Sequence, residues 1–151
     1  MTDLSLYLDP VCLDKPDFAP FSGAAGFSHH ITVNTGNEPL DEISKYSVAL
    51  IGIPDDRSSL NTGAALAPDA IRKNLYSFSR LPGKLRIIDL GNFKTGTGFE
   101  DTLAGLRDVL SMLLNENVVP VMIGGTSALM PAVDRALSSL RQPWSMVSVD
   151  S

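Results

Sequence analysis

Apolar and polar positions divide the chain near residue 45. Before that point no helical or alternating period persists, and four prolines interrupt the sequence. We therefore expect residues 1–45 to form an irregular N-terminal arm. Within it, 31–33 favours a short extended piece and 41–44 a turn of helix.

From Tyr46 the pattern becomes regular, because apolar runs alternate with helical periods. Three runs lie at 47–53, 85–90 and 118–123, the second of them ended by a glycine. Continuous apolar runs of this length are typical of strands that are buried on both faces, as in parallel sheets. A fourth run at 145–150 predicts a further strand.

The first segment with helical spacing begins at Pro68, because proline suits the first position of a helix. Ile71, Leu75 and Phe78 recur along it and predict its apolar face.

The second and third helical segments follow the next two strands. The second is the clearest, since one face is lined by Leu103, Leu106, Val109, Leu110, Leu113 and Leu114. The third follows a Gly124-Gly125 turn, and Pro131 requires that this helix has barely begun there.

The resulting order is β-α-β-α-β-α-β over residues 46–151. Such alternation predicts right-handed crossovers and a three-layer α/β/α fold with a mostly parallel sheet. In open α/β sheets, ligands bind outside the carboxyl ends of the strands. The segments 54–63, 91–98, 124–127 and 150–151 are therefore the expected functional loops.

Composition narrows the class of protein. The 151 residues hold 12 Lys+Arg against 17 Asp+Glu, a net charge of −5, and 44% are hydrophobic, which suits one globular core. The acidic balance argues against nucleic acid as a partner, and the apolar runs are too short to cross a membrane. With a single cysteine, Cys12, and no export signal, we expect a cytoplasmic protein.

Charged residues gather at the carboxyl ends of two predicted strands. Asp55, Asp56 and Arg57 follow the first strand and either bind a polar substrate, support a metal site, or form a solvated loop with local ion pairing. Asp150 ends the last strand, where a carboxylate is well placed for a cation. Alone it is one ligand, and a catalytic divalent ion usually takes three or more.

Other candidate motifs give weaker evidence for a metal, anion or nucleotide site. His29 and His30 are neighbours that point to opposite sides of an extended chain, so they form a poor chelate. The turn 124–127 either holds an anion with its backbone N–H groups or, as we favour, turns the chain while Thr126 or Ser127 caps the next helix. Glycine-rich nucleotide-binding motifs are missing from the sequence.

Five segments, in register over about 48–151, resemble the arginase/agmatinase/formimidoylglutamase family, the ureohydrolases. They are Gly52-Ile53-Pro54-Asp55 (family G-[VI]-P-x-D), Gly63–Arg72 (G-x-x-x-G-P-x-x-[IL]-R), Ile88–Asn92 (D-x-G-D/N), Pro120–Ser127 (P-[VI]-x-[LI]-G-G-D-H) and Val149-Asp150-Ser151 (V-D-A-H-x-D). The long arm, the stretch 53–57 and Asn61 look closest to a bacterial formimidoylglutamase-like branch.

The resemblance implies an arginase-like fold, of which this chain is the N-terminal half. It also implies a two-manganese centre that activates a water to attack a guanidino or formimino carbon. By the same resemblance, Asp55, Arg57, Asn61 and Gly63 belong to a loop on the substrate side.

The metal ligands that the family resemblance implies do not all match the residues of this chain. Thr126 and Ser127 stand where the family has Asp and a metal-binding His, and a serine hydroxyl is a poor Mn²⁺ ligand. Asp150 matches the first carboxylate of V-D-A-H-x-D, and the chain ends at Ser151 within that motif. One candidate ligand of the family's six therefore remains.

Two hypotheses follow. Under the first, the chain is the N-terminal segment of a ureohydrolase-like protein whose metal site is degenerate. It then binds no metal, is not catalytic as given, and has a binding or structural role. The alternative is that the parent protein is a manganese-dependent hydrolase of linear amidine C–N bonds with a small amidine-type substrate. Under either, the resemblance implies a homo-oligomer, and the end at Ser151 suggests a truncated product or half a fold kept for another purpose.

Overall fold

The computed structural model describes residues 3–12, 26–40, 42–57, 63–79, 83–140, 143–145 and 147. Asn61 and Asp150 lie outside the described residues, as does most of the strand expected at 145–150.

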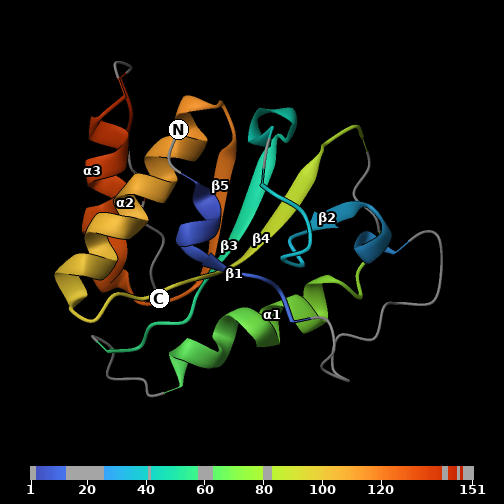
Figure 1. Cartoon of the computed structure of the whole chain (residues 1–151), viewed down its shortest axis with the longest axis horizontal. Coiled ribbons are helices and arrows are strands. Elements are labelled where there is room, and N and C mark those ends of the chain that lie inside the picture. The colour runs from blue at the N-terminus through green and yellow to red at the C-terminus, as the bar shows by residue number, and fades with distance from the viewer. Residues whose placement is uncertain are drawn as a thin grey trace.

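A mostly parallel sheet forms the centre of the fold (Figure 1). Its three longest strands are β3 (Val48–Ile53), β4 (Ile87–Phe93) and β5 (Val119–Gly124), which confirms the three predicted runs. In the order β1-β4-β3-β5, strand β3 pairs in parallel with β4 on one side and β5 on the other. This arrangement confirms the predicted fold class.

The N-terminal arm adds two short strands to this sheet. Strand β1 (Leu8–Asp9) pairs antiparallel with the second half of β4, and β2 (Ile31–Val33) pairs parallel with its first half. The extended piece expected at 31–33 is thus confirmed, and a 3₁₀ turn, η4 (Ile43–Lys45), lies near the expected turn of helix. Leu4 and Leu8 of the arm are buried in the core.

Strand β4 does not end at Gly91, contrary to the prediction. Gly91 has a φ of 91°, and the pairing register with β3 shifts there, so the strand continues to Phe93 through a bulge. A Cβ at Gly91 would lie 2.0 Å from the Asp9 carbonyl oxygen. Glycine is required because β1 approaches the bulge so closely.

Helices cover both faces of the sheet. Helix α1 (Ala67–Leu75) lies on one face, while α2 (Phe99–Asn115) and α3 (Met130–Ser138) pack together on the other (Figure 1). Alternate residues of β3 divide accordingly, since Ile51 packs in the cluster with α2 and α3 whereas Leu50 packs with Tyr76. Among the helices of the described residues, none is long and apolar enough to cross a membrane.

Helix α1 turns a different face to the sheet from the one predicted. Ile71 and Phe78, expected on its apolar face, are 41% and 60% exposed, whereas Leu75, expected there too, is partly buried and packs against the core cluster that contains Tyr76. The buried positions are instead Pro68, Arg72 and Tyr76, which follow each other at four-residue spacing. Apolar periodicity missed this face because its central member is an arginine.

The turn after β5 is as tight as expected, but its helix cap is not. Gly124 and Gly125 have φ values of 81° and 78°, which confirms the predicted turn. Neither Thr126 nor Ser127 caps α3 with its side chain, contrary to our prediction, because a 3₁₀ turn, η6 (Ser127–Leu129), intervenes and α3 begins at Met130. Pro131 lies in the first turn, as predicted.

A buried ion pair joins α1 to β4. The Arg72 guanidinium donates from Nε and Nη2 to the two carboxylate oxygens of Asp89, at 2.8 and 2.9 Å, and both side chains are 0% exposed. Arg72 also donates to the Asn92 side chain and, at 2.8 Å, to the Gly91 carbonyl. The pair therefore fixes the helix against the bulge of β4.

The surroundings of this ion pair complete its hydrogen bonds. The Tyr76 hydroxyl and the Gly91 N–H both donate to Asp89, at 2.7 and 2.9 Å. Burial and the Asp89 charge raise the pKa of the Tyr76 hydroxyl, which keeps it a donor. Burial is the largest single effect on Arg72 and opposes its charge, but hydrogen bonding to Asp89 and the nearby negative charges together outweigh it and raise the pKa of the guanidinium. Both carboxylate oxygens of Asp89 and the Arg72 guanidinium therefore have hydrogen-bond partners inside the fold.

Breaking this pair should be costly. Arg72→Met leaves the Asp89 carboxylate buried without its counter-ion, and removing one partner of a buried pair costs about 3–5 kcal/mol. We expect a loss of that size in the free energy of unfolding, measured by urea denaturation. Arg107→Met is the matched control, because the Arg107–Asp108 pair is about half exposed and should cost at most about 1 kcal/mol. Equal losses would contradict this account.

Candidate functional site

The loops that follow β3 and β4 meet at the carboxyl edge of the sheet. Asp55 and Arg57 come directly after β3, and the segment from Gly96 to Thr102 connects β4 to the first turn of α2. Parallel pairing of the two strands places these loops side by side, as expected from the sequence.

Asp55 and Arg57 form a local ion pair. The buried Asp55 carboxylate accepts hydrogen bonds from the Arg57 guanidinium, through Nε at 3.2 Å and Nη2 at 2.5 Å. The backbone N–H of Arg57 also donates to Asp55, at 3.0 Å. Of the alternatives considered from the sequence, local ion pairing is the one observed, although Asp55 is buried rather than solvated.

Arg57 also holds the neighbouring loop in place. Its Nη1 donates to the Gly96 carbonyl at 2.9 Å, and its Nη2 donates to the Thr102 hydroxyl at 2.6 Å. That hydroxyl in turn accepts from the Gly96 N–H at 2.9 Å. The guanidinium therefore ties the end of β3 to the start of α2, and few of its donors remain for a ligand.

The hydrogen bonds from Arg57 change the acidity of Asp55. They lower the pKa of the Asp55 carboxyl from its ordinary value, against the opposing effect of burial. Asp55 in turn raises the pKa of Arg57. Both groups are charged at neutral pH, and each neutralises the other.

The remaining substrate-loop candidates are only partly described. Asp56 accepts a hydrogen bond from the Gly63 N–H at 2.9 Å, so these two residues close the loop on itself. Gly63 has a φ of 101° and opens the short 3₁₀ turn η5 (Ala64–Leu66). Asn61 lies outside the described residues.

The Gly124–Ser127 segment lies at the carboxyl end of β5, next to the end of β3. A Cβ at Gly124 would lie 2.8 Å from the Pro68 ring, and one at Gly125 3.2 Å from Ile53. The glycines therefore bring the chain against β3 and the start of α1. Ser127 itself is exposed and Thr126 is half-buried.

The donors in the described part of the chain do not fit a manganese centre. Nowhere in that part do three His, Cys, Asp or Glu side chains cluster. Asp55, the carboxylate nearest the end of β3, is neutralised by Arg57, whose positive charge opposes a bound cation. Ser127 offers only a hydroxyl, and Asp150 lies outside the described residues.

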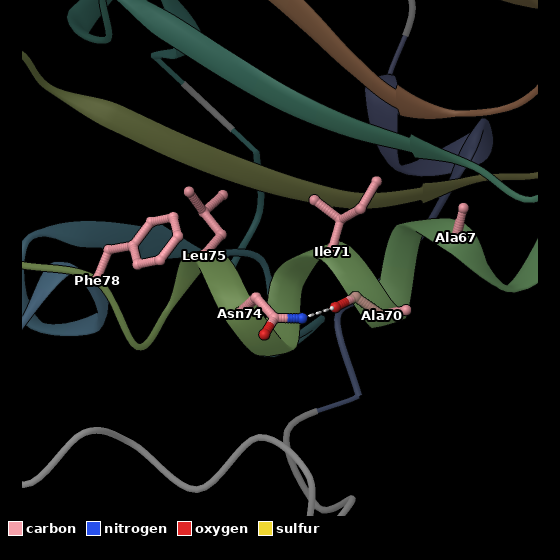
Figure 2. Close-up of a pocket in the computed structure, with 6 residues that line it drawn as sticks. All are labelled: Ala67, Ala70, Ile71, Asn74, Leu75 and Phe78. Atoms are coloured by element: carbon pink, nitrogen blue, oxygen red, sulfur yellow. Dashed lines mark hydrogen bonds between the residues drawn. The ribbon is translucent and has the colours of Figure 1, made fainter.

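A hollow of about 380 Å³ lies on α1 rather than at the loop edge. Figure 2 shows its lining residues along the helix, with Asn74 donating to the Ala70 carbonyl at 2.9 Å. The other lining side chains are apolar, with Ile71, Leu75 and Phe78 the largest. Without an ionisable group, this hollow offers nothing to recognise an amidine cation.

Sequence reasoning missed two residues that organise this edge. Thr102 is buried and links Arg57 to the loop before α2, and it lies four residues before Leu106 on the buried stripe of the helix. Asp89 stands among buried apolar residues in the first half of β4, two residues before the glycine of the bulge. A polar residue at a position that the pattern requires to be buried was the available signal in both cases.

Loss of the Asp55 charge should change how stability depends on pH. The pKa of Asp55 is lowered by folding, so its contribution is full above its unfolded value of about 3.9 and disappears as the pH falls through the folded value. We expect Asp55→Asn to lower the urea midpoint at pH 7, and the gap from the unchanged protein to be smaller at pH 3, which lies below the unfolded pKa, than at pH 7.

The control for this prediction is Asp108→Asn, since the Asp108–Arg107 pair is about half exposed and should contribute little at either pH. If the gap between the unchanged protein and Asp55→Asn stays constant between the two pH values, the assigned role of Asp55 is wrong.

Comparison with known proteins agrees with this architecture. The sequence model of the Arginase family matches residues 46–151, more than half of the chain. Formimidoylglutamase of Salmonella paratyphi C is 34% identical over 99 residues, covering 62% of this chain and 32% of that relative. Formimidoylglutamase of Salmonella heidelberg is 36% identical over 83 residues, covering 52% of this chain and 26% of that relative. The chain thus spans about a third or less of these relatives, and it belongs to the arginase family.

Proposed function

We propose that these 151 residues act as a non-catalytic, binding or structural segment of a ureohydrolase-like protein. The observation that carries this proposal is the side chain at the carboxyl end of β5. There the chain has Ser127, which is exposed, where the resemblance to the family calls for a metal-binding His. The same reasoning makes Asp150 a single remaining ligand.

The loop edge supports the same proposal. In a hydrolase of amidine substrates, a free carboxylate is the natural partner of the substrate cation. Here Asp55 already accepts from three nitrogen donors of Arg57, and Arg57 is fastened to Gly96 and Thr102. These contacts build a rigid loop edge, which suits holding the fold or a partner better than hydrolysis.

A second candidate function rests on the curated relatives. Both relatives named above are formimidoylglutamases, so a parent protein with a complete metal site would be a manganese-dependent hydrolase of linear amidine C–N bonds. Its substrate would be a small guanidino or formimino compound. Assembly into a homo-oligomer and a cytoplasmic location are part of both proposals.

Metal content separates the two proposals. We expect the purified chain, equilibrated with Mn²⁺ and then desalted, to retain no stoichiometric manganese, because a single carboxylate and a hydroxyl are a weak donor set. It should release neither urea from arginine or agmatine nor formamide from formimidoylglutamate. Two manganese ions per chain together with either product would overturn the non-catalytic proposal.

Two variants at position 127 sharpen this experiment. Ser127→His restores the imidazole that the family resemblance calls for, and Ser127→Ala is its control. Because residue 127 is exposed, both variants should keep the urea midpoint of the unchanged protein. Manganese retained by the His variant alone would show that the missing imidazole is what the site lacks.

A further inference from the structure

The oxygens around the Arg57 guanidinium form a set of acceptors that matches its donors. Nε and Nη2 donate to the two carboxylate oxygens of Asp55. Nη1 donates to the carbonyls of Gly96 and Thr97, at 2.9 and 3.3 Å, and Nη2 also donates to the Thr102 hydroxyl at 2.6 Å. These oxygens come from the end of β3, from the loop after β4 and from α2. Together they surround the planar fork of donors that a guanidinium presents.

These acceptors are also held by contacts that do not involve Arg57. The Thr102 hydroxyl accepts from the Gly96 N–H at 2.9 Å and donates to the Gly98 carbonyl at 3.3 Å, so its own loop fixes it. The Asp55 N–H donates to the Ile53 carbonyl at 3.0 Å, which places Asp55 at the end of β3. A set of oxygens positioned in this way is preorganised for a ligand, because little of it has to be ordered on binding.

Burial shows from which side the guanidinium enters. The Asp55 side chain is 2% exposed and Thr102 is fully buried, whereas the Arg57 side chain is 38% exposed. The guanidinium therefore approaches the oxygens from solvent. A buried carboxylate without a counter-ion is strongly unfavourable, so this site requires a cation. Because Arg57 lies two residues from Asp55, the chain supplies that cation at a high effective concentration.

The arrangement of the oxygens favours one kind of cation. An alkylguanidinium spreads its N–H groups over a planar fork, which reaches the carboxylate, the carbonyls and the hydroxyl at once. An ammonium ion has all its donors on one nitrogen and is more strongly hydrated, so it matches the same oxygens less well. The site should therefore select a guanidinium over an ammonium of equal charge.

We propose that the end of β3 and the loop before α2 form a guanidinium-binding site, and that Arg57 is its built-in ligand. Arg57 thereby excludes free guanidinium compounds from Asp55 and is a specificity-determining residue. This inference rests on the proposed function and deepens it, since it states what the closed loop edge of a non-catalytic segment keeps out.

The variant Arg57→Ala tests this inference, with methylguanidinium as the probe because it carries the donors of the missing side chain. We expect its titration, followed by NMR shifts of the Gly96 and Thr102 amides, to saturate with a dissociation constant on the order of 10 mM or tighter. The unchanged protein should show no saturable shift over the same range. Methylammonium, at equal concentration and ionic strength, is the control ligand and should bind at least about tenfold more weakly.

Urea denaturation gives a second readout, which also covers a variant that folds poorly. Methylguanidinium at five times its dissociation constant should raise the ratio of folded to unfolded Arg57→Ala about sixfold. Arg107→Ala is the matched control and should show no such rescue, because Arg107 donates to one oxygen of the half-exposed Asp108. Adding Asp55→Asn to Arg57→Ala should weaken binding of the probe by at least about tenfold, since the carboxylate is then gone.

Three results would each overturn the proposal. They are an equal response of Arg57→Ala to methylguanidinium and methylammonium, a response that survives the added Asp55→Asn, and unchanged protein that binds methylguanidinium as tightly as the variant. Manganese retention and product release are measured separately on the unchanged protein. The proposed function and this binding site can therefore fail independently.

Discussion

The ion pair between Arg72 and Asp89 is the interaction on which the rest of this structure depends. It is buried on the α1 face of the sheet, where a carboxylate without a counter-ion would be very unfavourable. The Arg72 side chain reaches the bulge of β4 through Asn92 and the Gly91 carbonyl. A Cβ at Gly52 would lie 2.0 Å from the Asn92 side-chain oxygen, so β3 must have glycine beside the pair. Helix α1 and the carboxyl ends of two strands are therefore positioned by one guanidinium.

The positions of this network change how the family motifs are understood. Gly52, Arg72, Asp89 and Asn92 all belong to the segments by which the chain resembles the arginase family. In this chain each of them acts in packing or buried hydrogen bonding, and Asp55 is likewise held by Arg57. These residues can therefore be kept for the fold, whether or not metal chemistry is kept beside them. Ser127, on which the proposed function rests, takes no part in this network.

Much of the fold was predictable from periodicity, and the failures share a physical cause. The three central strands and α2 were predicted because their apolar patterns match their buried faces. The buried face of α1 was missed because Arg72 occupies its centre, and partners such as Asp89 and Tyr76 are distant or unremarkable in sequence. The bulge at Gly91 depends on contact with Asp9, a residue of the arm whose pairing no local pattern reveals. At the loop edge, sequence identified Asp55 and Arg57 but could not show that they neutralise each other.

A double-mutant cycle on Arg72 and Asp89 tests the central claim most directly. The free energy of unfolding is measured for the unchanged protein, Arg72→Met, Asp89→Leu and the double variant. If the buried charges depend on each other, the double variant loses less than the sum of the single losses, with a coupling energy of about 2 kcal/mol or more. Losses that add to within about 0.5 kcal/mol would contradict the account, because the two side chains would then contribute independently.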